Sequence, residues 1–271
     1  MRPYPAIAIA CLIFLLTSPC LNAQSITWQR TLDSIMNSVI QRTIQSPGNV
    51  YASIGSGALG NNNKMIFVKF DQFGNILTQS FFDTSTTGSY DGYWIENAYG
   101  AGYIIAGAGE GPNGDAYLVR SDESGRVLWQ RTFGGFELDQ ARCVKKDGMN
   151  GYILLVTTFS LSAEADILVV RTDSLGNQTW STVIGLPNSL DFANEIEVTL
   201  DGSFVLVGTR VTGGIDSMYL VKLSNTGNKI WERTYRVMQS TQGKSLDQTG
   251  DSGFLLGGIC DSSQNNMRSV L

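Results

Sequence analysis

Residues 117–129 are YLVRSDESGRVLW. The same pattern returns twice and then once more loosely, as LVVRTDSLGNQTW at 168–180, YLVKLSNTGNKIW at 219–231 and FVKFDQFGN at 67–75. Within these copies a glycine recurs at a constant spacing of 51 residues: Gly74, Gly125, Gly176 and Gly227. A fixed period of about 50 residues predicts a repeat architecture in which every period folds into one unit of supersecondary structure.

Each period contains four short runs that are typical of β-strands, because they are rich in β-branched and aromatic residues and are separated by Gly, Asp or Asn. One set consists of ARCVKK (Ala141–Lys146), YILLVTT (Tyr152–Thr158), the run that begins at Leu168 and the run around Trp180. The fourth run contains a tryptophan in three periods and a threonine in the first: Trp129, Trp180, Trp231 and Thr78. Apolar residues in 32–44 have a helical spacing, but alignment with the other periods predicts a first strand in the second half of that segment.

The recurring glycine lies in a short turn between the third and fourth strands. In 71–75 (DQFGN) and 173–177 (DSLGN), the aspartate can accept a hydrogen bond from the backbone amide two residues later. The glycine can adopt the positive φ of a hairpin that ends in a bulge. A calcium loop is the alternative, but one carboxylate per turn is too few for a cation that takes 6–8 oxygen ligands. We therefore predict structural turns and no metal site.

The first 23 residues are typical of a secretory signal peptide. Arg2 precedes an apolar run over 6–16, and residues 21–23 (LNA) fit a cleavage site. Acylation at Cys20 is the alternative, which the preceding proline disfavours. The apolar run is too short to span a bilayer, and no second one follows. We predict a signal peptide over 1–23, a secreted or cell-surface location, and no membrane span in the domain over 24–271.

The composition excludes several classes of function. The net charge of −5 disfavours nucleic acid as a partner, since phosphates require a basic surface. The chain has no histidine, which excludes a Ser-His-Asp triad, a Cys-His pair and histidine-ligated zinc. After the signal peptide, Cys143 and Cys260 remain, and we predict that they are buried free thiols, with a disulfide as the alternative. We predict no cofactor.

The repeats resemble those of secreted bacterial β-propeller proteins, whose pattern is D-x-Y-L-V-K-L-D-x-x-G-N-x-x-W-x-x-T-Y-G-G. The resemblance is clear over Asp115–Phe133, in the Gly134-Gly135 pair that follows, and again from Asp166, and it covers nearly the whole chain after the signal peptide. It implies an all-β fold, a β-propeller of four-stranded blades, and export, without a common activity.

Two further predictions concern how the blades fit together. The glycine and tryptophan are spaced in a way similar to the tryptophan-docking motif of quinoprotein dehydrogenases, which implies that four rings wedge between blades: Trp28, Trp129, Trp180 and Trp231. The chain opens with a lone fourth strand, Ile26–Thr31, and ends at the start of a third strand, Met267–Leu271. We predict five blades, with the N-terminal strand as the outer strand of the last blade; a truncated piece of a larger propeller is the alternative.

Function on a repeat scaffold concentrates in the variable connections, which lie opposite the glycine turns. The longest such connection, over 81–90, is rich in aromatic residues. From this region we select four possible ligand-face residues: Phe82, Tyr90, Tyr93 and Trp94. The alternative is that half of these rings belong to the blade core.

Charged residues on the predicted first strands could line a central channel: Glu96, Arg142, Lys145, Glu195, Glu197 and Asp247. Paired carboxylates can hydrolyse glycosides, but mixed charges on different blades also fit solvated channel walls. We therefore predict an exported, non-catalytic binding scaffold for a protein or glycan, without catalytic residues. A carbohydrate-active hydrolase or lyase and a structural segment of a longer surface protein are the alternatives. The sequence leaves the oligomeric state open.

Overall fold

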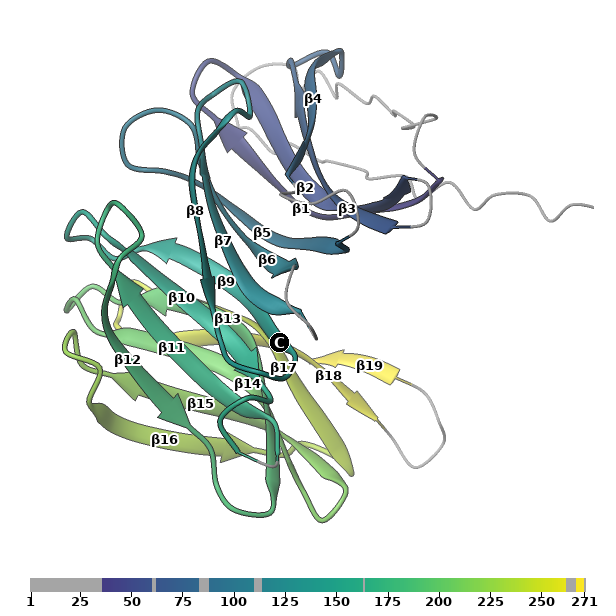
Figure 1. Ribbon diagram of the computed structural model, residues 1–271. Coiled ribbons are helices and arrows are strands. Elements are labelled where there is room, and N and C mark those ends of the chain that lie inside the picture. Colours follow the sequence, from purple (N-terminus) through teal and green to yellow (C-terminus); the bar gives the residue numbers. More distant parts are fainter. Residues whose placement is uncertain are drawn as a thin grey trace, which may run out of the picture.

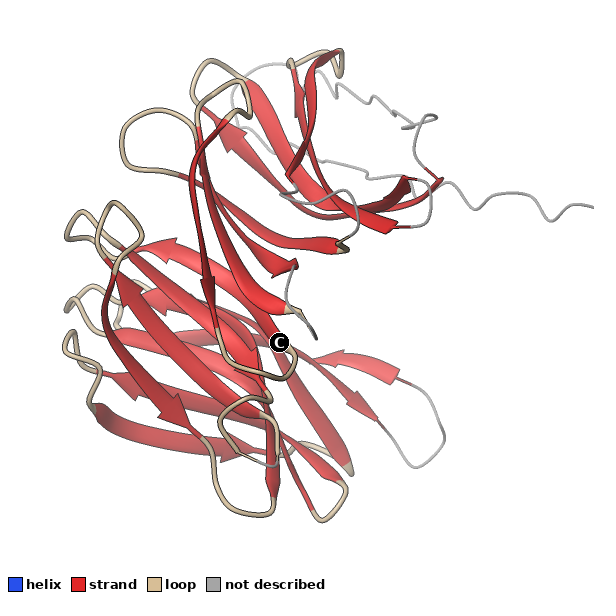
Figure 2. Cartoon of the chain, viewed as in Figure 1, coloured by secondary structure: helices blue, strands red, loops and turns tan. Residues whose placement is uncertain are grey.

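The computed structural model describes residues 36–59, 62–82, 88–109, 114–162, 164–261 and 267–270. In these ranges every regular element is a β-strand, as Figure 2 shows, which confirms the predicted all-β class. Nothing in them forms a helix long and apolar enough to cross a membrane. The signal peptide and the strand predicted at Ile26–Thr31 lie outside the described residues, so both stay predictions.

The strands form five antiparallel sheets that follow the order of the chain. The first sheet consists of β1 (Met36–Ser46), β2 (Val50–Leu59), β3 (Asn62–Phe70) and β4 (Ile76–Phe82). The second consists of β5 (Tyr90–Asn97), β6 (Tyr103–Gly109), β7 (Asp115–Ser121) and β8 (Val127–Phe133). The third consists of β9 (Asp139–Lys146), β10 (Tyr152–Thr158), β11 (Asp166–Thr172) and β12 (Gln178–Ile184). The fourth consists of β13 (Ser189–Val198), β14 (Phe204–Thr212), β15 (Ile215–Leu223) and β16 (Lys229–Tyr235), and the fifth of β17 (Ser240–Gln248), β18 (Phe254–Asp261) and β19 (Met267–Val270).

The first strand of each sheet packs against the sheet before it. β5 contacts β1, β2 and β3, β9 contacts β5, β6 and β7, and β13 and β17 repeat this relation one sheet further on. Figure 1 shows the sheets succeeding one another from purple to yellow. We call β1, β5, β9, β13 and β17 the inner strands. Face-to-face packing of successive four-stranded sheets is typical of propeller blades.

Each sheet has two chemically different ends. The connections between its first and second strands and between its third and fourth strands are short turns, and we call this the turn end. The connections between the second and third strands, and from one sheet to the next, lie at the opposite end, which we call the loop end. As predicted, the turn-end aspartates accept backbone hydrogen bonds: the amide of Phe73 donates to Asp71 Oδ1 (2.8 Å) and that of Leu175 donates to Asp173 Oδ1 (2.8 Å).

Three tryptophans pack one sheet against the next, as the docking motif implies. The ring centroids lie 6.3 Å apart in Trp129–Tyr152, 5.9 Å apart in Trp180–Phe204 and 6.3 Å apart in Trp231–Phe254. In each pair the tryptophan comes from the fourth strand of one sheet and its partner from the second strand of the following sheet. The fourth predicted wedge, Trp28, is outside the part of the chain that the structure describes.

The recurring glycine is required for two reasons at once. Gly176 has a φ of +78°, a conformation that strains any residue with a Cβ. A Cβ at Gly176 would also lie 2.6 Å from the ring of Trp129, which comes from the preceding sheet. Gly227 repeats both features with Trp180, whose Nε1 donates to the carbonyl of Asn225 in the same hairpin (3.2 Å). In both cases the tryptophan of the preceding sheet therefore packs directly on the glycine hairpin.

Every inner strand contains, at an equivalent place, an extra residue that has no partner on the neighbouring strand, and β1 has a second irregularity between Met36 and Val39. These β-bulges fall at the same place in all five sheets, and we call their unpaired members the bulge residues: Gln41, Tyr93, Arg142, Asn194 and Lys244. A bulge redirects a side chain and is over-represented beside functional sites. The repeat thus presents five different side chains from one backbone position near the loop end.

Candidate functional site

A pocket of about 330 Å³ lies at the loop end of the third, fourth and fifth sheets, and we call it the inner pocket. It is lined by residues of β9, β10, β13, β14, β15 and β17: Gln140, Arg142, Thr157, Phe192, Ala193, Asn194, Thr209, Val211, Asp216, Gln242 and Lys244. Its volume is at the lower end of the range for small-molecule sites. Such sites commonly lie where several elements meet, as three sheets do here.

Three bulge residues contribute to this lining. Arg142, Asn194 and Lys244 extend from β9, β13 and β17, one from each of the three sheets. Asn194 Nδ2 donates to the carbonyl of Gly243 at 2.6 Å, which joins the fourth sheet to the fifth at the pocket. A fourth bulge residue, Tyr93, lies beside the pocket, because the Arg142 guanidinium is 4.4 Å from the centre of its ring. The bulges therefore assemble side chains that belong to different repeats.

The pocket has a positive side. Burial, and then the charge of Arg142, lower the pKa of the Lys244 ammonium below its usual value. The carboxylate in the lining belongs to Asp216, whose Oδ2 accepts a hydrogen bond from Gln242 Nε2 at 2.6 Å. Neither Arg142 nor Lys244 forms a salt bridge with a carboxylate of the described residues. Two cations thus share the pocket with one acid.

The four residues selected from the sequence have different fates. Phe82, Tyr90 and Trp94 are buried, with exposed fractions of 1 %, 0 % and 8 %. Phe82 and Tyr90 pack in the sheet core, where their ring centroids lie 5.6 Å from Phe67 and 5.4 Å from Tyr117. The burial of these three rings agrees with the alternative that part of the set belongs to the blade core. Tyr93 alone of the four is half-exposed, and a ligand role for the set stays a prediction.

The structure brings together three of the six charged inner-strand residues, and we call Lys145, Glu195 and Glu197 the inner charge cluster. Lys145 Nζ forms an ion pair with Glu197 and lies 3.6 Å from Glu195 Oε1. Glu195 Oε2 accepts a hydrogen bond from the amide of Leu246 on β17 at 3.2 Å. Burial raises the pKa of Glu195, although the charge of Lys145 opposes the shift. Among the described residues, Glu96 and Asp247 form no ion pair with this cluster.

Sequence reasoning missed Arg42, which approaches the same cluster from β1. Its guanidinium lies 3.3 Å from the ring centre of Trp94, and Lys145 Nζ lies 5.0 Å from that ring on the neighbouring strand. Both are cation–π contacts. Arg42 Nε and Trp94 Nε1 are buried and have no hydrogen-bond partner within the described ranges. Arg42 occupies the position in its strand that Trp94 and Glu195 occupy in theirs, and this correspondence in the repeat is the signal that could have found it.

Metal and thiol chemistry find no support here. Among the described residues there is no group of three or more His, Cys, Asp or Glu side chains that could hold a metal ion. Cys143 and Cys260 are buried free thiols, as the sequence predicts. Burial raises the pKa of Cys143, so its thiol stays protonated at neutral pH and is a poor nucleophile.

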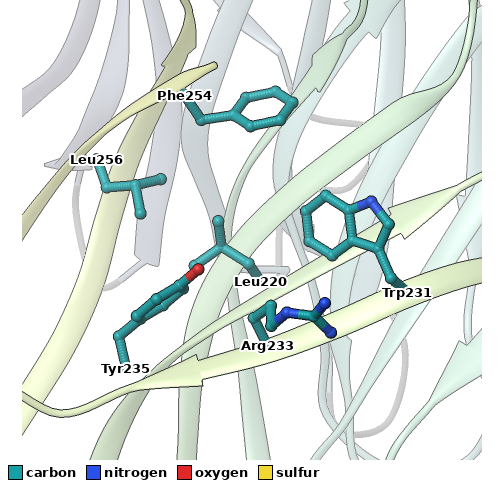
Figure 3. Close-up of a pocket in the computed structure, with 6 residues that line it drawn as sticks. All are labelled: Leu220, Trp231, Arg233, Tyr235, Phe254 and Leu256. Carbon is teal, nitrogen blue, oxygen red and sulfur yellow. The ribbon is translucent and has the colours of Figure 1, made fainter. Parts of the chain in front are cut away.

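A second hollow of about 270 Å³ lies between the fourth and fifth sheets, and Figure 3 shows the residues that line it. We call it the outer groove: Leu220, Trp231, Arg233, Tyr235, Phe254 and Leu256. β19 pairs with β18 only over 258–261, so Phe254 and Leu256 lie on the part of β18 that β19 does not reach. The groove therefore lies between the outer strands of the fourth sheet and the part of β18 that does not pair with β19.

No protein-family model and no curated protein sequence matches this chain. Solved structures do. The endo-arabinase from Bacteroides thetaiotaomicron is similar, with a TM-score of 0.53 at 14 % identity over 88 % of this chain and 93 % of that one. A eukaryotic initiation factor (TM-score 0.42, 12 % identity, 85 % and 50 % of the two chains) and a subtype N11 neuraminidase-like protein of a flat-faced bat isolate (0.34, 10 %, 88 % and 92 %) are more distant. The first likeness supports the all-β propeller fold and leaves the number of blades open.

Proposed function

We propose that this chain is an exported propeller that binds a glycan through the inner pocket without transforming it. The observation that supports this proposal is the chemistry of the lining. Amides (Asn194, Gln242) and hydroxyls (Thr157, Thr209) surround the pocket beside the ring of Phe192. Convergent hydrogen-bonding groups and an aromatic face suit a ligand that has many hydroxyls.

A carbohydrate-active enzyme is the second candidate, and the inner charge cluster is what favours it. Glycoside hydrolysis uses two carboxyl groups, and one of them commonly has a raised pKa, as Glu195 has. However, the second carboxylate, Glu197, is held in an ion pair with Lys145. Neither glutamate lines the inner pocket, whose own carboxylate, Asp216, is a single one. We therefore favour binding over catalysis.

The proposal includes how the protein is built and where it resides. We infer that residues 1–23 direct export and that Ile26–Thr31 completes the fifth sheet as its fourth strand. Trp28 would then hold the position in that sheet that the three wedge tryptophans hold in theirs. The strand count of the fifth sheet supports this closure, because the structure describes three strands in it and four in each of the other sheets. Service as one segment of a longer surface protein, and membership of the secreted bacterial repeat family, stay predictions.

A glycan array tests the proposed function, with two variants that add the same bulk at opposite ends of the fourth sheet. Val211→Trp fills the inner pocket, and Leu200→Trp adds an exposed ring in a turn-end loop, where Leu200 is 79 % exposed. We expect the native chain and Leu200→Trp to retain a glycan, an arabinan or another, and Val211→Trp to lose it. If both variants still bound the glycan, the inner pocket would not be the binding site. Recovery of a protein partner with no glycan bound would contradict the glycan proposal, and release of shortened products would favour the enzyme.

A further inference from the structure

The inner pocket has an excess of positive charge in a chain that is acidic as a whole. The net charge of the chain is −5, yet the lining has two cations, Arg142 and Lys244, against one carboxylate, Asp216. The charge of Asp216 partly opposes the lowering of the pKa of Lys244, but the two side chains do not form a salt bridge. Two like charges that line one pocket repel each other, and an anion bound between them would relieve this repulsion.

The two cations are held on rigid elements. Both are bulge residues, Arg142 on β9 and Lys244 on β17, so each has a strand position and not a loop position. The guanidinium of Arg142 lies over the Tyr93 ring, and Gln140 Nε2 donates to the Tyr93 hydroxyl at 3.3 Å. A stacked guanidinium is pre-organised to present its fork to a planar anion, which lowers the entropy lost on binding.

One further polar group in the pocket lacks a partner. The Oγ1 atom of Thr209 is buried and makes no hydrogen bond to any of the described residues, and Thr209 itself is 4 % exposed. The hydroxyl of Thr157, by contrast, accepts the amide of Ala193 at 2.9 Å. A buried hydroxyl without a partner costs free energy that a ligand hydroxyl or an ordered water can recover.

We propose that the inner pocket recognises an acidic sugar, a hexuronate unit, whose carboxylate lies between Arg142 and Lys244 while its hydroxyls face Thr209 and the neighbouring amides. Arginine binds a planar carboxylate through two parallel hydrogen bonds, which a single neutral hydroxyl cannot accept. A volume of about 330 Å³ suits a ligand of one or two sugar rings and not a polymer. This proposal rests on the proposed glycan-binding function and narrows it to a class of glycan.

Calorimetric titration of the full chain with three matched disaccharides tests the proposal: digalacturonate, digalactose and 6-sulfated digalactose. We expect the uronate to bind most tightly and its affinity to fall with added salt. Arg142→Gln and Lys244→Gln should each weaken uronate binding at least tenfold, because each removes a charge-assisted hydrogen bond to the carboxylate. Affinity for the neutral sugar should change less than threefold.

Arg126→Gln is the matched control for net charge. Arg126 is 77 % exposed at the turn end and pairs with Asp122, so its loss removes the same charge far from the pocket and should leave uronate affinity unchanged. If Arg142→Gln does not fold, as judged by its unfolding midpoint, Lys244→Gln alone decides. Tight digalactose binding that Val211→Trp abolishes and both cation variants retain would overturn the uronate proposal and leave the glycan function standing. Preference for the sulfated sugar would overturn the carboxylate, and binding of none of the three would overturn both proposals.

Discussion

The turn end and the loop end of the sheets differ in what the repeat conserves. At the turn end, the glycine hairpin and the tryptophan of the preceding sheet recur with the same geometry, as Gly176 with Trp129 and Gly227 with Trp180. At the loop end, the bulge recurs with the same backbone geometry, but the side chain at the bulge differs in every sheet. At the turn end, the same side chains recur because they pack one sheet against the next. At the loop end, the same backbone bulge recurs with different side chains, and this is where the candidate site lies.

The largest expected effect lies at the turn end, in Trp180→Ala. Trp180 packs on Phe204 and donates to the carbonyl of Asn225, both in the next sheet. Removal of this half-buried ring leaves a void between two sheets and should lower the free energy of unfolding by about 3 kcal/mol. Urea denaturation followed by tryptophan fluorescence measures this, with the remaining tryptophans as the probe.

Val183→Ala is the control for Trp180→Ala, because Val183 lies on the same strand and is 51 % exposed. Its effect should stay within about 0.5 kcal/mol. If the two variants lost equal stability, the tryptophan would not be a wedge. The claim that the turn end serves to pack one sheet against the next would then be wrong.

Gly176→Ala should cause the next largest loss of stability, from backbone strain and from a clash with the Trp129 ring. Gly148→Ala separates these two causes. Both glycines have nearly the same φ, +78° and +77°, but a Cβ at Gly148 meets nothing within 4 Å. Gly148→Ala should cost about 1 kcal/mol from backbone strain alone. Gly176→Ala should cost about 2 kcal/mol or more, because the methyl group also displaces the Trp129 ring. Equal unfolding midpoints for the two variants would show that the glycine serves the turn alone.

The smallest expected effect is a change in the pH dependence of stability in Glu195→Gln. Because burial raises the pKa of Glu195 above its ordinary value of 4.5, the folded chain binds more protons there than the unfolded chain at pH values just above 4.5. Stability therefore falls as pH rises through this window, and glutamine should remove that fall while it still accepts the amide of Leu246. The groups that face the carboxyl are Lys145, Glu197 and Arg42. Parallel stability curves from pH 4 to 7 in the two proteins would contradict the raised pKa.

Much of the fold could be predicted from the sequence, because each strand recurs in several periods and the copies can be compared with one another. Alignment with the other periods correctly favoured a strand in the second half of 32–44, where local spacing alone favours a helix, and β1 covers Met36–Ser46. Burial of Phe82 and Tyr90 could not be predicted in this way, because these residues flank a connection whose path no other repeat specifies.

The bulges escaped prediction for a physical reason. Alternation of apolar and polar residues indicates a strand, and one extra residue shifts that alternation in the middle of the run. Cys143 and Val144 are both buried, and so are Glu195 and Ile196 at the equivalent positions. Two successive buried residues in an otherwise alternating strand were the available signal. Without that shift, Arg142 could be assigned to an inner strand but not to a pocket shared with Lys244.

The direction of tryptophan docking has a consequence for how the protein forms during synthesis. Each tryptophan ring packs on a hairpin that belongs to the following repeat. The packing of a sheet on its C-terminal side is therefore complete as soon as one more period has emerged from the ribosome. Contacts of this kind close loops of only one period and favour stepwise growth from the N-terminus, in which each finished sheet serves as the template for its successor. The inner pocket, which needs three successive sheets, would then be among the last features to form.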